Sequence, residues 1–524
     1  MKENKYFIIG LSILFFFVVF FSSINYSMTY DELSFTARSY YFIKTLDFNL
    51  TTSHPPLMSL IGGTPFIFFE TNNDLLSEMK DNINYKYTFN TFAGDKIDDF
   101  VFLWAREMYG YKAALFSTTL LIFNPNIIAH SGLNTNDIGI TLFMFLTIFT
   151  FWKFMKTSDK KYLIITGILL GISMFSKMTA LYLFPIMIVL LFLRIIYRKR
   201  TRDKLLDRFK KSSKHLLLIF IIGILTVNAA YLFKGTFTPL IKDTKSHPAL
   251  DKVLPENMRN FTYTVLRTVP LPLPELYVDG IGGMFSKSVF GHKTFLLGEY
   301  SQTGWWYYYI IAFLMKNPVP LMILIFLTFV IWKRKKIEDE IFLLIPIIIL
   351  FIAFSLGNIQ IGIRHLLPIF PFLFVFLGQI GNKISFRNLN KDILSFSIII
   401  LSVWYIFSSL FAFPHYIAYF NEFVGDNDYK YLSDSNIDWG QDLKNLKIYM
   451  KENNIDIIKL SYFGTANVTS YGIKYQELGC NKEGGIIAIS AMHLMDINKK
   501  DCYSWLNKFD PVGRAGRSIL VYKI

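Results

Sequence analysis

Residues 6–24 read YFIIGLSILFFFVVFFSSI, an apolar run without a charged side chain. A helix of about 20 residues, rising 1.5 Å per residue, crosses roughly 30 Å of hydrocarbon. The run follows Lys2 and Lys5, as the apolar core of a signal peptide would. It is long for such a core, however, and no small-residue cleavage site follows it cleanly. We therefore interpret residues 6–24 as a retained first membrane span.

Similar apolar runs recur along the chain. Hydrophobic residues make up 52% of the sequence and charged residues only 18%, whereas soluble proteins carry about a quarter charged residues. The sequence therefore predicts an α-helical polytopic membrane protein with about 10–11 spans. The further runs lie near residues 112–129, 138–152, 162–176, 179–197, 215–234, 310–332, 341–358, 366–382 and 393–411.

Lys and Arg gather in short segments between the apolar runs. Cytoplasmic loops of membrane proteins carry such an excess of basic residues. The same signal accounts for the net charge of +15, so nucleic acid is not an expected partner. We place the amino terminus in the cytoplasm together with four basic segments, residues 153–161, 194–214, 333–336 and 383–391.

The remaining loops must then face the outer side of the cell membrane. Two of them, residues 25–98 and 235–305, are far longer than a hairpin needs, and long loops tend to be functional. We predict a transmembrane domain over residues 1–411 and a small extracytoplasmic α/β domain over residues 412–524. The latter combines a helical stretch near 442–453 with strand-like runs at 457–463, 486–490 and 518–524.

The span count fails between the first run and residue 111. Both Lys2 and the turn at residues 109–112 should be cytoplasmic, so an odd number of spans must lie between them. The only candidate is residues 98–108, which is too short to cross and begins with two Asp. Either this passage is distorted and buried in protein, or the fold departs from the pattern here.

Acidic residues stand at two of the predicted outer membrane boundaries. Asp31 and Glu32 follow the first span, where a carboxylate could act as the general base that deprotonates an acceptor. The alternative is a solvated pair of acids after a helix end. Asp137 stands where an outer loop re-enters the membrane, and there it is either a helix N-cap, a functional acid, or both.

Histidines and cations form a second group of candidates. His54 precedes two prolines that fix an extended turn, although a lone histidine is more often structural than catalytic. Lys177 and the Arg364–His365 pair lie at predicted outer boundaries, where a charge is costly and usually functional or paired. Arginine is well suited to hold a phosphate. Snorkelling of these side chains to the lipid headgroups is the alternative.

Metal-binding patterns are weak. Residues 434–442, DSNIDWGQD, look faintly like a calcium loop, but Trp439 stands where the loop glycine is needed and Asn445 stands in place of the bidentate Glu. We reject an EF-hand and expect a polar turn that leads into a helix. Cys480 and Cys502 show no metal-ligand spacing. Both lie outside in this topology, where they either form a disulfide or remain free thiols.

Several motifs, taken in order, resemble those of the phospholipid-carrier-dependent glycosyltransferases of the GT-C fold. That family includes the protein O-mannosyltransferases of family 39 and the aminoarabinose transferases of lipid A. The motifs cover nearly the whole chain, and their order is more specific than any one of them. They are Tyr30-Asp31-Glu32, His54-Pro55-Pro56-Leu57, Trp104 to Gly110, Asn124 to His130 with Asp137, Gly171 to Lys177, Pro272-Leu273-Pro274, Gly304 to Tyr308, Gly362 to Pro368, Asp434 to Gln441 and Arg514 to Val521.

The resemblance implies an inverting transfer of a sugar from a polyprenyl-phosphate carrier to a protein, lipid or glycan acceptor on the outer face. It implies that Asp31, with Glu32 beside it, is the catalytic base. Asp137 and His54 would shape the acceptor cavity. The carrier phosphate would be held by Lys177 and by the Arg364–His365 pair. No cofactor is required by this reading, but a weakly held divalent cation at Asp31 and Asp137 is an alternative.

Two features of the chain depart from the family pattern, and two rival functions are considered beside the glycosyltransferase. Family members carry a full apolar span before the motif at residues 104–110, whereas residues 91–99 are polar in this chain. Met58 and Ser59 follow the His-Pro-Pro-Leu motif, where mannosyltransferases often lead to a Lys. The alternatives are a polytopic lipid or sugar transporter and an inactive homologue that binds lipid. We see no inverted repeat of hydropathy, the feature that would favour the transporter.

Overall fold

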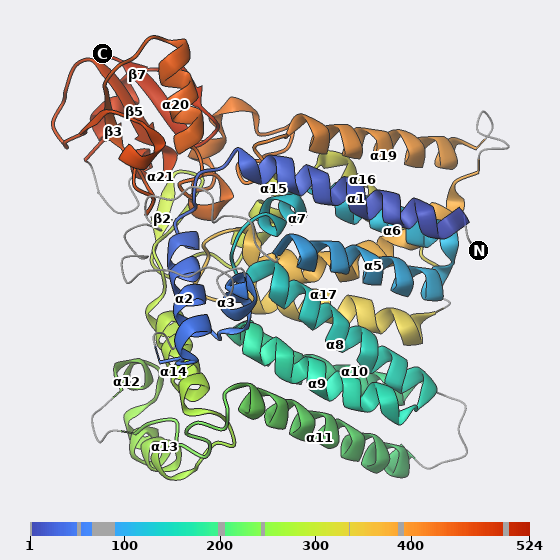
Figure 1. Ribbon diagram of the computed structural model, residues 1–524. Coiled ribbons are helices and arrows are strands. Elements are labelled where there is room, and N and C mark those ends of the chain that lie inside the picture. The colour runs from blue at the N-terminus through green and yellow to red at the C-terminus, as the bar shows by residue number, and fades with distance from the viewer. Residues whose placement is uncertain are drawn as a thin grey trace.

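The apolar runs of the sequence form helices that lie side by side in one bundle, with a small sheet domain at one corner (Figure 1). The computed structural model describes residues 3–49, 54–64, 90–197, 205–242, 247–334, 336–385, 392–495 and 502–524. The basic residues Lys2, Arg387 and Lys391, which we used to predict the orientation, lie outside these ranges.

The bundle is built from helices that follow the predicted runs closely. Neighbours in it include α8 with α9, α9 with α11, α1 with α5, and α10 with α17. Its helices are α1 (Glu3–Ile24), α5 (Asn90–Tyr109), α6 (Tyr111–Ile122), α7 (Pro125–Ser131), α8 (Asp137–Thr157), α9 (Lys160–Ser176), α10 (Leu183–Tyr197), α11 (Leu205–Ala230), α15 (Tyr308–Lys316), α16 (Val319–Ile331), α17 (Ile337–Ser355), α18 (Phe370–Leu377) and α19 (Ile393–Phe411).

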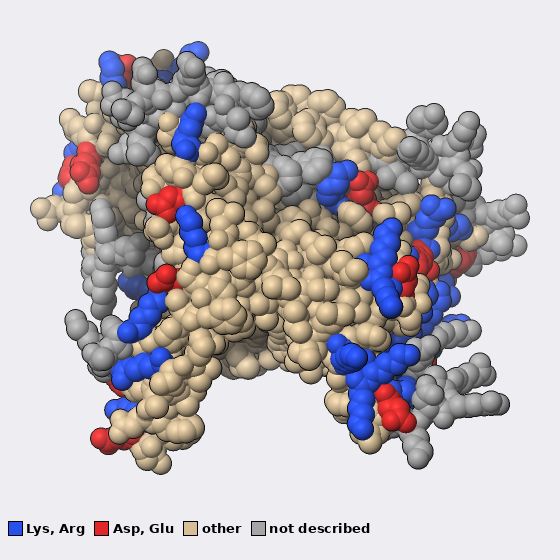
Figure 2. All heavy atoms as spheres, turned by 60° about the horizontal axis from the view of Figure 1, so that its bottom comes forward, with Lys and Arg blue, Asp and Glu red and all other residues tan. Residues whose placement is uncertain are grey.

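Several of these helices suit a membrane. Among the described residues, five helical stretches are long and apolar enough to cross one, and two bent pairs, α6 with α7 and α15 with α16, would raise the number to seven. Figure 2 shows a broad uncharged band on one face, with charged side chains on its left and right sides. The prediction of an α-helical, multi-pass membrane protein is confirmed.

Helix α5 accounts for the span that the sequence count lacked. The passage begins at Asn90 rather than at residue 98, so the helix has 20 residues and is about 30 Å long. One of its charged residues faces protein: Asp98 is 1% exposed and accepts a hydrogen bond of 2.9 Å from Ser12 on α1. Such a residue lowers the hydropathy of the helix although a neighbouring helix, rather than water, satisfies it.

Shorter elements cover the end of the bundle that lies away from the amino terminus (Figure 1). In their described residues, the loop after α1 contains two helices, and the long loop after α11 contains three helices and a β-hairpin. These elements are α2 (Glu32–Thr45), α3 (Leu57–Gly62), α12 (Pro248–Val253), α13 (Glu256–Thr268), α14 (Glu275–Phe290), β1 (Thr294–Leu296) and β2 (Glu299–Ser301).

The carboxyl-terminal region forms a five-stranded sheet with the order β4-β3-β5-β7-β6. Strand β3 pairs in parallel with β4 and β5, whereas β7 pairs antiparallel with β5 and β6. Apolar residues of α20 cover one face of the sheet. The predicted small α/β domain is confirmed. Its elements are α20 (Leu443–Glu452), α21 (Ala491–Leu494), β3 (Ile458–Ser461), β4 (Tyr475–Glu477), β5 (Ile486–Ser490), β6 (Gly513–Ala515) and β7 (Ile519–Lys523).

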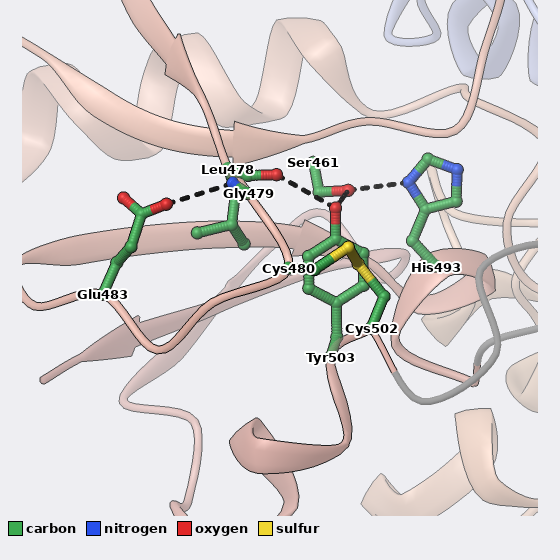
Figure 3. Close-up of a disulfide and its surroundings, with 8 residues drawn as sticks. All are labelled: Ser461, Leu478, Gly479, Cys480, Glu483, His493, Cys502 and Tyr503. Atoms are coloured by element: carbon green, nitrogen blue, oxygen red, sulfur yellow. Dashed lines mark hydrogen bonds between the residues drawn. A yellow bond between two sulfur atoms is a disulfide. The ribbon is translucent and has the colours of Figure 1, made fainter.

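A disulfide joins Cys480 to Cys502 in this domain (Figure 3). It links the loop after β4 to the segment that leads into the 3-10 helix η9 (Ser504–Lys508). Beside it, the Tyr503 hydroxyl donates to the Leu478 carbonyl oxygen and accepts from Ser461. Of the two alternatives that the sequence left open, the structure has the disulfide.

Candidate active site

Asp31 and Arg364 meet at the end of the bundle that carries α2 and α3. Asp31 ends the loop after α1 and precedes α2, and Arg364 lies in the 3-10 helix η4 (Ile363–Ile369) that leads into α18. The distance from Arg364 Nη1 to Asp31 Oδ2 is 2.9 Å. The two residues are far apart in sequence, so only the folding of the bundle creates this ion pair.

A second ion pair lies beside the first. Lys177 Nζ is 2.6 Å from Asp137 Oδ1, and Arg364 Nη1 is 4.0 Å from Asp137 Oδ2. Asp137 is the first residue of α8, where the helix dipole favours a negative charge. Lys177 ends α9 in an extended conformation. The four side chains therefore form a chain of alternating charge: Asp31, Arg364, Asp137 and Lys177.

The exposure of these side chains differs in a way that matters for chemistry. The Asp31 side chain is 32% exposed, whereas that of Asp137 is only 4% exposed. The cations are intermediate, with Arg364 at 11% and Lys177 at 17%. A general base must touch the proton that it removes, and of these two acids Asp31 has the more accessible carboxylate.

Glu32 lies next to Asp31 but is buried, with only 1% of the residue exposed. One carboxylate oxygen accepts from the backbone N–H and the hydroxyl of Thr29, and the other accepts from the backbone N–H of Asn134. Glu32 thus connects the loop after α1 to the loop before α8. These contacts favour a positioning role for Glu32 over direct contact with a substrate.

His54 lies near the charge cluster, with its ring 5.5 Å from the ring of Phe35 on α2. Burial, together with the nearby cations Lys177 and Arg38, lowers the pKa of His54 to about 3. The imidazole is therefore neutral near pH 7. A neutral ring can line a cavity or donate one hydrogen bond, but it does not add positive charge.

His365 follows Arg364 but packs in a different direction. Its Nδ1 atom is 3.0 Å from the Tyr309 hydroxyl, and its ring contacts that of Phe354. His365 is thus held among aromatic side chains of α15 and α17, while its neighbour Arg364 reaches the acids. Of the three residues predicted to hold the carrier phosphate, Arg364 and Lys177 therefore belong to the charge cluster, and His365 does not contact its acids.

The sequence analysis missed Trp439 as a part of this site. The Arg364 guanidinium carbon lies 4.3 Å from the centre of the Trp439 ring, a cation–π contact. Trp439 is buried and belongs to the segment that we had interpreted as a polar turn. The family-like motif at residues 434–441 could have indicated that Trp439 belongs to the site. The sequence around Trp439 does not show, however, that its ring contacts Arg364.

Metal binding finds little support in the described part of the chain. No group of three or more His, Cys, Asp or Glu side chains that could hold a metal ion occurs there. Asp31 and Asp137, the carboxylates considered for a divalent cation, already contact Arg364 and Lys177. A divalent cation at this position stays a prediction.

Comparisons with known proteins agree with this fold. A family model described as dolichyl-phosphate-mannose-protein mannosyltransferase matches residues 99–229, which include Asp137 and Lys177. No curated protein matches the chain by sequence.

Two solved structures resemble the whole chain. One is ArnT from Cupriavidus metallidurans bound to undecaprenyl phosphate, with 11% identity, a TM-score of 0.50, and coverage of 98% of this chain and 97% of ArnT. The other is the oligosaccharyltransferase AglB from Archaeoglobus fulgidus in complex with an inhibitory peptide and a dolichol-phosphate. It has 14% identity, a TM-score of 0.50, and coverage of 100% of this chain and 75% of AglB.

The chain shares the GT-C fold of these proteins. The proteins that it resembles are glycosyltransferases that depend on a lipid phosphate. The resemblance that the motifs suggested is thereby confirmed at the level of the fold.

Proposed function

We propose that the chain is an inverting glycosyltransferase that moves a hexosyl or pentosyl group from a polyprenyl-phosphate carrier to a protein, lipid or glycan acceptor on the outer face of the cell membrane. The observation that carries the proposal is the Asp31–Arg364 ion pair beside Asp137 and Lys177. It combines an accessible carboxylate with two cations. ArnT binds undecaprenyl phosphate and AglB binds a dolichol-phosphate in the two solved structures, which supports a carrier of this class.

In the proposed reaction, Asp31 accepts the proton of the acceptor hydroxyl or amine. The acceptor atom then attacks the anomeric carbon from the face opposite the phosphate, and the bond from that carbon to the phosphate oxygen breaks. The leaving group is a polyprenyl phosphate that keeps the electron pair and needs no proton near neutral pH. Arg364 and Lys177 stabilise the negative charge that develops on it.

The location on the outer face is supported by charge and by the disulfide. The helix ends beside the basic segments, such as the end of α8 and the start of α11, lie on the side of the bundle that carries the amino terminus (Figure 1). The two ion pairs of the site, Asp31–Arg364 and Asp137–Lys177, lie at the other side of the bundle. Basic loops remain in the cytoplasm, and disulfides such as Cys480–Cys502 persist in oxidising compartments.

The test is transfer of a radiolabelled sugar from polyprenyl-phosphate donors by the purified protein in vesicles. Asp31→Asn should keep normal expression and thermal stability and lose roughly 10²–10⁴-fold in kcat. Asp279→Asn is the matched control, because Asp279 also pairs with a cation, Lys242, outside the site. Normal transfer by Asp31→Asn would show that Asp31 is not the catalytic base. A wild-type protein that binds the donor but transfers no sugar would favour an inactive homologue.

A further inference from the structure

The segment 433–441 connects the bundle to the sheet domain and is almost entirely buried. Ser435, Asn436, Asp438, Trp439 and Gln441 are all among the buried residues. Burying so many polar groups is costly unless each finds a hydrogen-bond partner. The partners identify what the segment holds in place.

One half of the segment holds the loop before Arg364. The Ser435 hydroxyl donates to the Ile361 carbonyl oxygen at 2.6 Å, and the Ile363 backbone N–H donates to Asn436 Oδ1 at 3.0 Å. Between these contacts, Gly362 has a φ of +134°, and a Cβ atom there would lie 2.2 Å from Ser435 Oγ. The glycine thus lets the two backbones approach, and the start of η4 is fixed on the segment.

The other half of the segment holds the loop before Asp31. The backbone N–H and the hydroxyl of Ser27 donate to the carbonyl oxygens of Gln441 and Gly440, each at 2.8 Å. The Tyr30 backbone N–H donates to the Trp439 carbonyl oxygen at 2.8 Å. The residue that immediately precedes the proposed base is therefore hydrogen-bonded to the segment.

Trp439 connects the two halves. Its carbonyl oxygen binds Tyr30, while its ring lies against the Arg364 guanidinium at 4.3 Å. A planar ring beside a planar guanidinium restricts the guanidinium and offsets part of its lost hydration. It thereby helps to hold Nη1 at 2.9 Å from Asp31 Oδ2.

We propose that segment 433–441 is a positioning element of the active site, with Trp439 and Asn436 as its positioning residues. It sets the separation between Asp31 and Arg364, so that the carrier phosphate replaces Asp31 as the partner of Arg364 and leaves the carboxylate able to accept a proton. The sheet domain is then a required part of the catalytic site rather than an appended module. This inference rests on the proposed function.

The first experiment measures donor kcat and KM for Trp439→Leu and Trp439→Phe in vesicles. Trp439→Leu should lower kcat/KM for the donor roughly tenfold or more, mainly through donor KM, because Arg364 loses its orientation. Trp439→Phe keeps a ring and should stay within about threefold of wild type. Met450→Ala, a buried change on α20, is the control that destabilises the domain without touching the site; it should lower Tm and leave donor KM unchanged.

A double-mutant cycle shows whether the effect passes through Arg364. In an Arg364→Lys background, Trp439→Leu should lower kcat/KM for the donor by less than about threefold further, because the effects of mutations at two residues in contact are not additive. Equal losses in both backgrounds would overturn the coupling. Wild-type kinetics in Trp439→Leu would overturn the inference while leaving the proposed function intact.

A binding measurement separates failure of this inference from failure of the proposed function. If the wild type transfers no sugar, the proposed function fails, and the shift in Tm caused by undecaprenyl phosphate alone becomes the readout. Trp439→Leu and Asn436→Ala should each reduce that shift, whereas Met450→Ala should not. A shift that is unchanged in both variants would overturn the positioning role.

Discussion

The two ion pairs of the site differ in how they are made, although they lie side by side. Asp137 and Lys177 sit at the ends of the adjacent helices α8 and α9, and the carboxylate is 4% exposed. Asp31 lies in the loop before α2 and Arg364 in the short 3-10 helix η4, and Asp31 is 32% exposed. A pair with a buried carboxylate at the end of a long helix keeps its geometry, whereas a pair with an open carboxylate can exchange its partner. We therefore expect the first pair to matter for stability and the second to matter for turnover.

The largest expected effect is the loss of transfer in Arg364→Met. Removing the cation that we propose to face the leaving phosphate should lower kcat/KM roughly 10²–10³-fold. Stability should change little, because water can hydrate the open Asp31 carboxylate. Sugar transfer and thermal unfolding, measured on the same preparation, test both statements. Arg259→Met, an arginine beside Asp251 in the loop after α11, serves as the control; a large loss of Tm in Arg364→Met would contradict the comparison.

The second effect is a loss of stability in Lys177→Met. This change leaves the Asp137 carboxylate buried with a more distant cation, and breaking a buried ion pair costs about 3–5 kcal/mol. The double variant Asp137→Asn/Lys177→Met should recover much of the lost stability, since no charge is then left unpaired. Thermal or denaturant unfolding in detergent measures this. Unchanged stability in Lys177→Met would remove the distinction between the two pairs.

A third, smaller effect concerns pH and His54. Because its pKa is about 3 in the folded protein, the unfolded chain binds a proton that the folded chain lacks between about pH 6.5 and 3. The free energy of unfolding should therefore fall as pH falls through this window. His54→Gln should reduce that dependence, and Lys177→Met should reduce it in part, because Lys177 is one of the cations that lower the pKa. Identical Tm-versus-pH curves for wild type and His54→Gln would argue against it.

The smallest effect is the response to salt. Added salt screens exposed charges more than buried ones, and the Debye length falls from about 10 Å at 0.1 M to about 3 Å at 1 M. Raising the salt concentration should increase donor KM about twofold through Arg364. It should leave the stability contribution of the Asp137–Lys177 pair unchanged. Donor KM and Tm, measured at both salt concentrations, compare the pairs directly; a KM that does not respond would contradict an open Asp31–Arg364 pair.

Much of the fold could be predicted because its signals are local. Apolar runs and basic segments mark the helices and their ends, and the strand-like runs near residues 458, 486 and 519 correspond to β3, β5 and β7. Strands β4 and β6 were not predicted, since three residues carry too little pattern. Helix α5 was misjudged because Asp98 suggests a position in water, whereas its partner Ser12 lies on α1.

In the candidate site, too, the individual residues could be predicted from the sequence, whereas the contacts between them could not. Charges near hydrocarbon single out Asp31, Asp137, Lys177 and Arg364 one by one. Their pairing, the burial of Glu32 and the orientation of His365 away from the acids depend on which helices become neighbours, and no local pattern states that.

By itself, the sequence determined that the chain is a helical membrane protein, and it singled out the charged residues of the candidate site. It also predicted the direction of insertion. Hydropathy and charge are properties of each residue along the chain, so these features can be read without the fold. Only the tertiary structure decided that Asp31 faces Arg364 and that Trp439 lies against that arginine. Ion pairs and ring contacts act over a few ångströms between segments that are far apart in the sequence, so they exist only once the bundle and the sheet domain have packed together.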